Sequence, residues 1–227
     1  MQKNILVSIT GSQEKNWQDK LQEITDFKIQ EIALFLEIFE KEQREKIYQA
    51  LLTSNVKSIP LVHIRHDMTK DELQFLKTTF KAKYFTCHEE NFVHHDIEHW
   101  KGFYKNIFLE MNFDNFVSKK VMVEKIGGFC IDLAHFKVGL EKLSKDFEYV
   151  YSKNKMAKYF KCNHVNGYNP KINKDMHTIY SFKEFDYLKT LPEFVFGNVI
   201  ALEMSNPIQE QLEFKKYLTK LLSEKFK

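Results

Sequence analysis

The sequence predicts an α/β fold, and within that class one (βα)₈ barrel spanning residues 1–227 as a single domain. Two observations lead to this prediction. Short apolar runs rich in β-branched and aromatic residues recur eight times, and amphipathic segments with helical spacing separate them. Near-continuous apolarity is typical of strands buried on both faces, and alternation with helices is typical of parallel sheets. No Gly/Ser/Pro-rich linker or low-complexity tract divides the chain.

The eight predicted strands follow one another at intervals that leave room for a helix between each pair. In chain order they are Asn4–Ser12, Glu31–Phe39, Ile59–His66, Lys83–His88, Asn106–Asn112, Gly128–His135, Lys158–Val165 and Asn198–Met204. Eight units with no remainder favour a closed barrel. A doubly wound open sheet is the alternative, but no glycine-rich phosphate loop follows the first run.

The segments between the strands carry helical signals. Ser12 is a candidate cap for a first helix, and Thr69 opens a capping-box pattern after the third strand. Asn206 and Pro207 are expected to cap and to open the last helix. Three apolar stripes mark the inner faces of helices: Trp17, Leu21 and Ile24; Leu73, Leu76 and Phe80; and Phe136, Leu140, Leu143 and Phe147. The seventh connection is long and irregular before a short helix near residues 183–188.

Charge and composition exclude several classes of function. The 34 basic and 31 acidic residues nearly cancel, and only Arg44 and Arg65 are arginines, which argues against extensive contact with nucleic acid. No apolar run approaches the roughly 20 residues that span a bilayer, so no membrane partner is expected. The apolar segment at Ile5–Ile9 is too short for a signal peptide. The three cysteines, an odd number, indicate reduced thiols and a cytoplasmic protein.

Each of the last four predicted strands ends in a potential metal ligand. These ligands are Glu110, Asp132, His164 and Glu203. Because side chains alternate between faces along a strand, the residues two positions earlier would fill the barrel interior below them, namely Phe108, Cys130, Cys162 and Ala201. A carboxylate on an apolar strand is costly without a partner, and neighbouring carboxylates repel unless a cation intervenes. The pattern therefore predicts a divalent-metal site (Mn, Zn, Mg, Co or Fe) at the carboxyl ends of the strands, with a metal-free hydrogen-bond network as the alternative.

The motifs at the ends of the later predicted strands, taken in chain order, resemble those of a known family. Leu109-Glu110-Met111-Asn112, Asp132-Leu133-Ala134-His135, His164, Asp175-Met176-His177 and Glu203 resemble the xylose isomerase-like barrel superfamily. That superfamily includes sugar and sugar-phosphate isomerases and epimerases, and apurinic/apyrimidinic (AP) endonucleases of the endonuclease IV type. In the endonuclease branch, the resemblance implies that His66, His88, His135, Asp175 and His177 contact further metal or substrate. The family often has Asp three residues after the seventh-strand histidine, where this chain has Gly167.

The resemblance implies a metal-dependent isomerase or epimerase of a small sugar or sugar phosphate. Glu110 and Glu203 would then bind the metal and also move protons next to a metal-polarised carbonyl. The partner would be a small carbohydrate. The alternatives are an AP-endonuclease-type phosphodiesterase acting on DNA, which the scarcity of arginine makes the second choice, and a degenerate metal-binding barrel without catalysis.

Two further residues lie close to this set in the predicted barrel. We predict that His63, two residues from Arg65, faces outward or supports a neighbouring residue, whereas His66 faces the site. Glu37 ends the predicted second strand and could either line the pocket or make a salt bridge.

Overall fold

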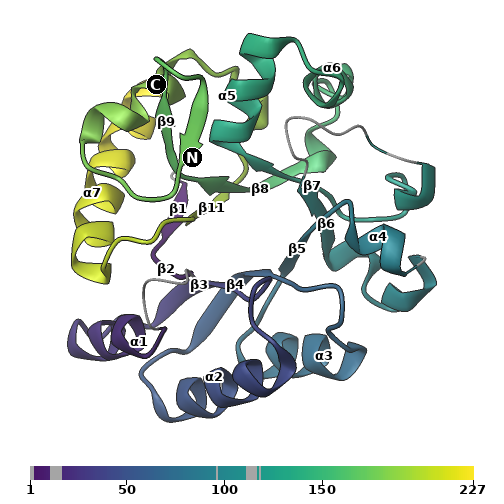
Figure 1. Ribbon diagram of the computed structural model, residues 1–227, viewed down its shortest axis with the longest axis vertical. Helices are drawn as coiled ribbons and strands as arrows, with labels where there is room; N and C mark the ends of the chain where they lie inside the picture. The colour runs from purple at the N-terminus through teal and green to yellow at the C-terminus, as the bar shows by residue number, and fades with distance from the viewer. Residues whose placement is uncertain (1–2, 11–16, 96, 111–116, 118) are drawn as a thin grey trace.

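The predicted strands form a closed parallel ring in a computed structural model of the protein, which describes residues 3–10, 17–95, 97–110, 117 and 119–227 (Figure 1). The strands of the ring are β1 (Asn4–Leu6), β2 (Ser8–Ile9), β3 (Glu31–Phe35), β4 (Ser58–His63), β5 (Tyr84–His88), β6 (Ile107–Glu110), β7 (Gly128–Asp132), β8 (Phe160–Val165) and β11 (Val199–Leu202). A separate antiparallel hairpin, β9 (Gly167–Asn169) and β10 (Lys174–Met176), follows β8.

The ring closes through the first predicted strand, which is interrupted at Val7. Its first half, β1, pairs in parallel with the last strand β11, and its second half, β2, pairs in parallel with β3. The Val7 carbonyl accepts a hydrogen bond of 2.9 Å from the Ala33 amide, which continues the ladder across the interruption. Because both edges of the sheet are paired, the fold is the predicted (βα)₈ barrel rather than an open sheet.

Helices cover the outside of the ring (Figure 1). They are α1 (Trp17–Asp26), α2 (Lys41–Thr53), α3 (Lys70–Thr79), α4 (Asn91–His94), α5 (Leu133–Lys142), α6 (Lys145–Ser152) and α7 (Ile208–Lys225). Short 3₁₀ turns lie at Ile97–Trp100, Tyr104–Asn106, Lys119–Val121, Ala157–Tyr159, Phe182–Thr190 and Glu193–Val195. Among the described residues, none of the helices is both long enough and apolar enough to cross a membrane.

Two cores result from the alternation of side chains along each strand. Outward-facing side chains pack under the helices in the larger core. Inward-facing side chains fill the barrel, and they are Leu6, Ala33, Phe35, Leu61, Phe108, Cys130, Cys162 and Ala201. The predicted interior positions Phe108, Cys130, Cys162 and Ala201 are thereby confirmed. The three cysteines are buried and free, as expected of small apolar fillers.

Several predicted boundaries differ from the structure for identifiable reasons. Strand β7 ends at Asp132 rather than His135, because the Asp132 side chain caps α5 by accepting a hydrogen bond from the His135 amide. The predicted stripe from Phe136 to Phe147 spans two helices, since Leu143 is left-handed (φ 51°) and Ser144 caps α6.

The predicted helix caps have mixed outcomes. The capping box at Thr69 is confirmed, with Glu72 as its partner. Asn206 does not cap α7, because Pro207 occupies that position and the Asn206 amide instead bonds both backbone groups of Ile179. The predicted cap Ser12 lies outside the described residues.

Candidate metal centre

Four buried side chains meet at the carboxyl end of the ring. Glu110, Asp132 and His164 stand at or near the ends of β6, β7 and β8, and Glu203 directly follows β11. The strand register pairs Asp132 with His164, and the Glu203 amide bonds the Val165 carbonyl at 2.9 Å. One ligand atom from each of the four lies within 4.8 Å of the others. The structure therefore brings together the whole set that the sequence predicts as the core metal ligands.

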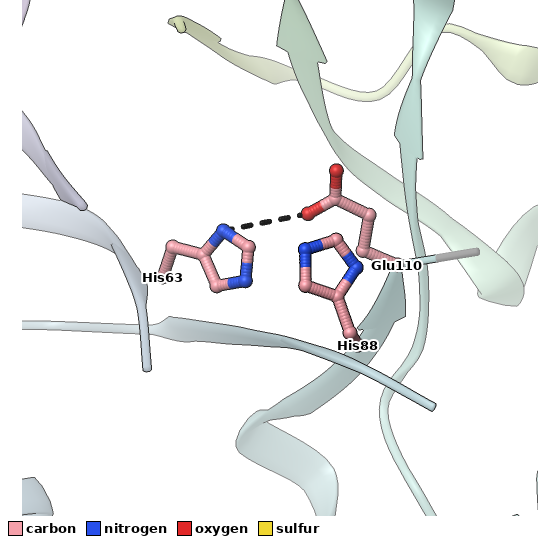
Figure 2. Close-up of side chains that lie close together, drawn as sticks. All are labelled: His63, His88 and Glu110. Atoms are coloured by element: carbon pink, nitrogen blue, oxygen red, sulfur yellow. Dashed lines mark ion pairs between the residues drawn. The ribbon is translucent and has the colours of Figure 1, made fainter. Parts of the chain in front are cut away.

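A second group shares Glu110 with the first. His63 and His88 reach it from β4 and β5, and Figure 2 shows the three side chains converging. The His63 Nδ1 lies 3.5 Å from the Glu110 Oε2, and the two imidazole rings lie 4.8 Å apart. One possible ligand atom from each of His63, His164 and Glu203 also lies within 4.8 Å of the other two. The two groups therefore form one continuous cluster across the mouth of the barrel, which we call the inner cluster.

The predicted outward orientation of His63 is wrong. His63 is fully buried and faces the inner cluster, whereas His66 belongs to none of the ligand groups among the described residues. His66 lies beyond the end of β4 and stacks on His94, with ring centroids 4.5 Å apart. The reason is the alternation of side chains along the strand: Leu61 faces the interior, so His63 does as well.

A third group lies at the rim of the barrel. His135, in the first turn of α5, is 3.8 Å from the Asp175 Oδ2 through its Nε2, and the His177 Nε2 is 3.0 Å from the same oxygen. Asp175 comes from the return strand β10 of the hairpin. The His177 Nδ1 lies 3.3 Å from the Glu203 carbonyl, which ties this rim cluster to the end of β11.

Asp132 connects the two clusters. Its Oδ1 accepts the His135 amide at 2.8 Å, and its Oδ2 accepts the Asn166 Nδ2 at 2.9 Å. The main-chain carbonyl of Asn166 accepts a hydrogen bond of 3.1 Å from the Tyr187 hydroxyl. One carboxylate therefore positions the helix that carries a rim ligand while it contributes an oxygen to the inner cluster.

Burial and neighbouring charges shift the pKa values of the inner cluster in both directions. Burial would raise the pKa of Glu110 and lower that of His164, but the charges of the histidines hold the pKa of Glu110 well below its usual range, and Glu110 and Glu203 raise the pKa of His164. Burial raises the pKa of Asp132 to about 7, with Glu203 and Glu110 raising it further and His135 opposing. Burial, followed by the charge of Glu203, raises the pKa of Glu37 to about 8. Burial also lowers the pKa of His63 to about 3, which keeps its imidazole neutral and able to act as a ligand.

In the rim cluster, opposite charges also outweigh burial, as they do for His164 and Glu110. Burial would lower the pKa of His177, but its contact with Asp175 raises that pKa to about 9. Burial likewise opposes the rise at His135, where Asp132 and Asp175 raise the pKa to about 10. Hydrogen bonds from both histidines hold the pKa of Asp175 well below its usual range. These groups form an ion network that a metal ion would have to deprotonate on binding.

The donor atoms of the inner cluster fit a metal because so many are buried without a hydrogen-bond partner. They are both nitrogens of His63, the Nδ1 of His88, both carboxylate oxygens of Glu110, the Nδ1 of His164 and the Oε2 of Glu203. The His164 Nδ1 lies 2.8 Å from a Glu110 oxygen without hydrogen-bond geometry. Buried polar atoms are almost always paired, and a cation held between these atoms would supply the partner that they lack. Imidazole and carboxylate donors suit Zn²⁺, Mn²⁺, Fe²⁺ or Co²⁺.

Three residues of this site were missed or misplaced by sequence reasoning. His63 and Thr86 both sit at inward positions of their strands, and strict alternation from the interior residues below would have found them. The Thr86 hydroxyl lies 3.2 Å from the His164 Nε2. Asn166 follows β8 and carried no periodic signal. Glu37 lines the cluster, with its Oε2 3.9 Å from the His63 Nδ1. Met111 and Asn112 of the Glu-Asn motif lie outside the described residues.

Comparisons with known proteins add one likeness in fold. No protein-family model matches the chain, and no curated protein matches it. Among solved structures, the chain is similar to the crystal structure of an AP endonuclease, family 2, from Brucella melitensis. That likeness has 11% sequence identity and a TM-score of 0.48, and it covers 95% of this chain and 99% of that chain. The assignment of this chain as a barrel comes from its own closed ring of strands.

Proposed function

We propose that the protein is a metal-dependent phosphodiesterase that cleaves DNA at abasic sites, the second of the two activities implied by the sequence resemblance. The observation that carries this proposal is the number of ligand groups. Four sets of His, Asp and Glu side chains lie at the carboxyl end of the barrel: three of them overlap in the inner cluster, and the rim set is separate. A small-sugar isomerase needs one or two metals with open coordination. A fuller cluster suits hydrolysis of a phosphodiester, in which charge develops on several oxygens at once.

We assign the candidate ligands to three metal ions. Glu110, Asp132, His164 and Glu203 would hold one ion, His63 and His88 with Glu110 a second, and His135, Asp175 and His177 a third. Bound there, divalent metal ions would activate water and stabilise negative charge on the phosphate and leaving oxygens. All chemistry would take place at the strand ends, where barrels of this kind carry their active sites.

Neighbouring side chains orient the ligands. If His164 binds through Nδ1, its Nε2 carries the proton, and this N–H donates a hydrogen bond to the Thr86 hydroxyl oxygen, which fixes the tautomer and the ring. Asn166 holds Asp132 in one orientation by donating to its Oδ2. Asp175 fixes the two rim imidazoles against each other.

A duplex oligonucleotide with one abasic site tests the proposal. The metal-loaded protein should nick the strand at that site, with activity that falls as salt rises because phosphate contacts release counterions. His177→Ala and Glu110→Gln should each reduce cleavage by a hundredfold or more, on the order of the losses seen when one charge-stabilising group is removed. His66→Ala is the matched control and should cleave normally. Failure of the metal-loaded wild-type protein to nick abasic DNA would rule the proposal out.

A sugar isomerase is the second candidate, and the arginines favour it. Arg44 pairs with Glu72 and Asp67, and Arg65 pairs with Glu40, so neither guanidinium is placed to grip a phosphate backbone. Glu110 and Glu203 would then transfer protons beside a carbonyl. Incubation with small aldoses and ketoses in D₂O distinguishes the two candidates. Exchange of deuterium at the carbon beside the carbonyl, together with inert abasic DNA, would favour the isomerase.

A further inference from the structure

A cavity of about 340 Å³ lies at the amino ends of β5, β6, β7 and β8, away from the candidate metal centre. Tyr84 opens β5, Gly127 directly precedes the first residue of β7, and Tyr159 directly precedes β8, and all three line the cavity. The same four strands carry candidate metal ligands at or near their other ends. Along β5, for example, Tyr84 and His88 are separated by about 13 Å. A molecule in this cavity would therefore occupy a site distinct from the candidate metal centre.

The inner wall of the cavity is aromatic. Phe108 is one of the side chains that fill the barrel interior, and it also lines the cavity. The Tyr84 ring packs edge-on against the Phe108 ring, with ring centroids 5.1 Å apart. A methyl group placed on Gly127 would lie 2.6 Å from the Phe108 ring, so glycine at this position leaves room for the ring. This wall suits the apolar part of a small molecule.

A β-bulge brings a lysine to the cavity. In the register of β7 and β8, Phe129 pairs with Phe160. The next residue of β7, Cys130, pairs with Cys162, which leaves Lys161 as an extra residue in β8. Phe160 packs in the outer core and Cys162 in the barrel interior, whereas Lys161 lines the cavity. Bulges commonly redirect a side chain, and the side chain that this bulge places at the cavity is cationic.

The walls of the cavity carry more positive than negative charge. Three lysines line it, namely Lys105, Lys158 and Lys161. Glu124 is the single acidic residue among the described residues that line it, and it is already engaged. Its Oε2 accepts the Tyr159 hydroxyl, and its Oε1 lies 3.8 Å from the Nζ of Lys153. The hydrogen bond from Tyr159 lowers the pKa of Glu124, and the charges of nearby lysines lower it further. The cavity therefore presents three ammonium groups beside one carboxylate that is already paired.

We propose that this cavity binds a small phosphate monoester, with the phosphate among the three lysines and an aromatic or apolar body against Tyr84 and Phe108. The inference does not depend on the proposed function. A phosphate monoester carries close to two negative charges near pH 7, which complements three ammonium groups and one carboxylate. Lysine binds phosphate as a point charge, without the planar fork of arginine. A cavity of this volume has no room for a nucleic-acid duplex, so this ligand is not the proposed DNA substrate.

Isothermal titration of the metal-loaded full chain with phenylphosphonate tests the inference. This probe has the charge and the ring of an aromatic phosphate monoester, and its phosphorus–carbon bond resists hydrolysis. Lys158→Gln with Lys161→Gln should weaken the Kd by about tenfold or more, because charged hydrogen bonds to the probe are lost. Methylphosphonate, which keeps the charge and lacks the ring, should bind the wild type about tenfold more weakly, because it buries less apolar surface.

Two control variants separate this cavity from the metal centre and from lysines in general. Glu110→Gln should lower the metal content and keep the binding site that the Lys158 and Lys161 variant loses. Lys216→Gln with Lys220→Gln removes two charges from α7 and should bind phenylphosphonate as the wild type does. Thermal unfolding should be the same in both lysine variants and the wild type, because Lys158 is exposed and Lys161 is partly exposed.

Several results would overturn the inference. They are unchanged binding in the Lys158 and Lys161 variant, loss of the site in Glu110→Gln, an equal loss in the α7 control, and equal affinity for the two phosphonates. A protein that binds phenylphosphonate as expected but leaves abasic DNA intact would contradict only the proposed function.

Discussion

Two clusters of buried charge in this protein differ in how completely they are paired. Beside the barrel, the fully buried Arg44 guanidinium bonds Glu72 at 2.9 Å, Asp67 at 3.0 Å and the Phe39 carbonyl at 2.8 Å. At the mouth of the barrel, the His164 Nδ1 lies 2.8 Å from a Glu110 oxygen as an ion pair without hydrogen-bond geometry, and both nitrogens of His63 and the Nδ1 of His88 are buried without a hydrogen-bond partner. The first cluster is paired throughout, and the second leaves several buried donor atoms unpaired. Pairing, rather than burial of charge, separates a structural network from a candidate site.

Arg44→Met should have the largest effect on folding. It leaves the Glu72 carboxylate without its partner, and removing one member of a buried ion pair costs about 3 kcal/mol or more. Urea denaturation should show this loss, with metal content unchanged. Arg65→Met is the control, because its partner Glu40 is 68% exposed, and such pairs contribute about 1 kcal/mol or less. An equal loss in the two variants would show that the Arg44 network is not the structural cluster described here.

Glu203→Gln should affect the metal-dependent part of stability. The amide keeps the shape of the side chain and removes its repulsion with Glu110, which offsets the loss of its ion pair with His164, so the metal-free variant should stay folded. Metal at a hundredfold excess over its Kd should stabilise the wild type by about 2.7 kcal/mol, and the variant far less. Thermal unfolding with and without Zn²⁺ or Mn²⁺ measures both. A variant that gains as much from metal as the wild type would remove Glu203 from the site.

The pH dependence of the metal-free protein should report the rim cluster. Asp175 raises the pKa of His177 to about 9, above the unfolded value of roughly 6.5. This contribution to stability is therefore fully present below about pH 6.5 and is lost as pH rises through about 9. Asp175→Asn should flatten the profile in that window, and metal should stabilise the wild type more at the upper end, where fewer protons compete. Urea unfolding across pH 6–9.5 checks this, and a flat wild-type profile would contradict it.

Sequence patterns predicted the fold because the barrel depends on periodicity. Eight apolar runs specified eight strand positions, and alternation specified which side chains fill the interior, as Cys130 and Ala201 show. The same alternation places His63 inward. The sequence prediction instead placed His66 in the site, because His66 stands at the end of the predicted strand. Alternation is least regular at strand ends. Asp132, for example, is the last residue of β7 and also caps α5. Asn166 and the hairpin depend on tertiary contacts that no local pattern encodes.

Metal stoichiometry tests the central claim most directly. Elemental analysis of the purified protein, after incubation with Zn²⁺ or Mn²⁺ and removal of free metal, gives the number of ions bound per chain. The overlapping ligand sets of the inner cluster and the separate rim set predict more than one tightly bound ion per chain in the wild type. We expect about one fewer in Asp175→Asn, which removes a rim ligand, and no change in His66→Ala. A wild-type chain that retains no metal would contradict the account, because the unpaired donors at the barrel mouth would then have another explanation.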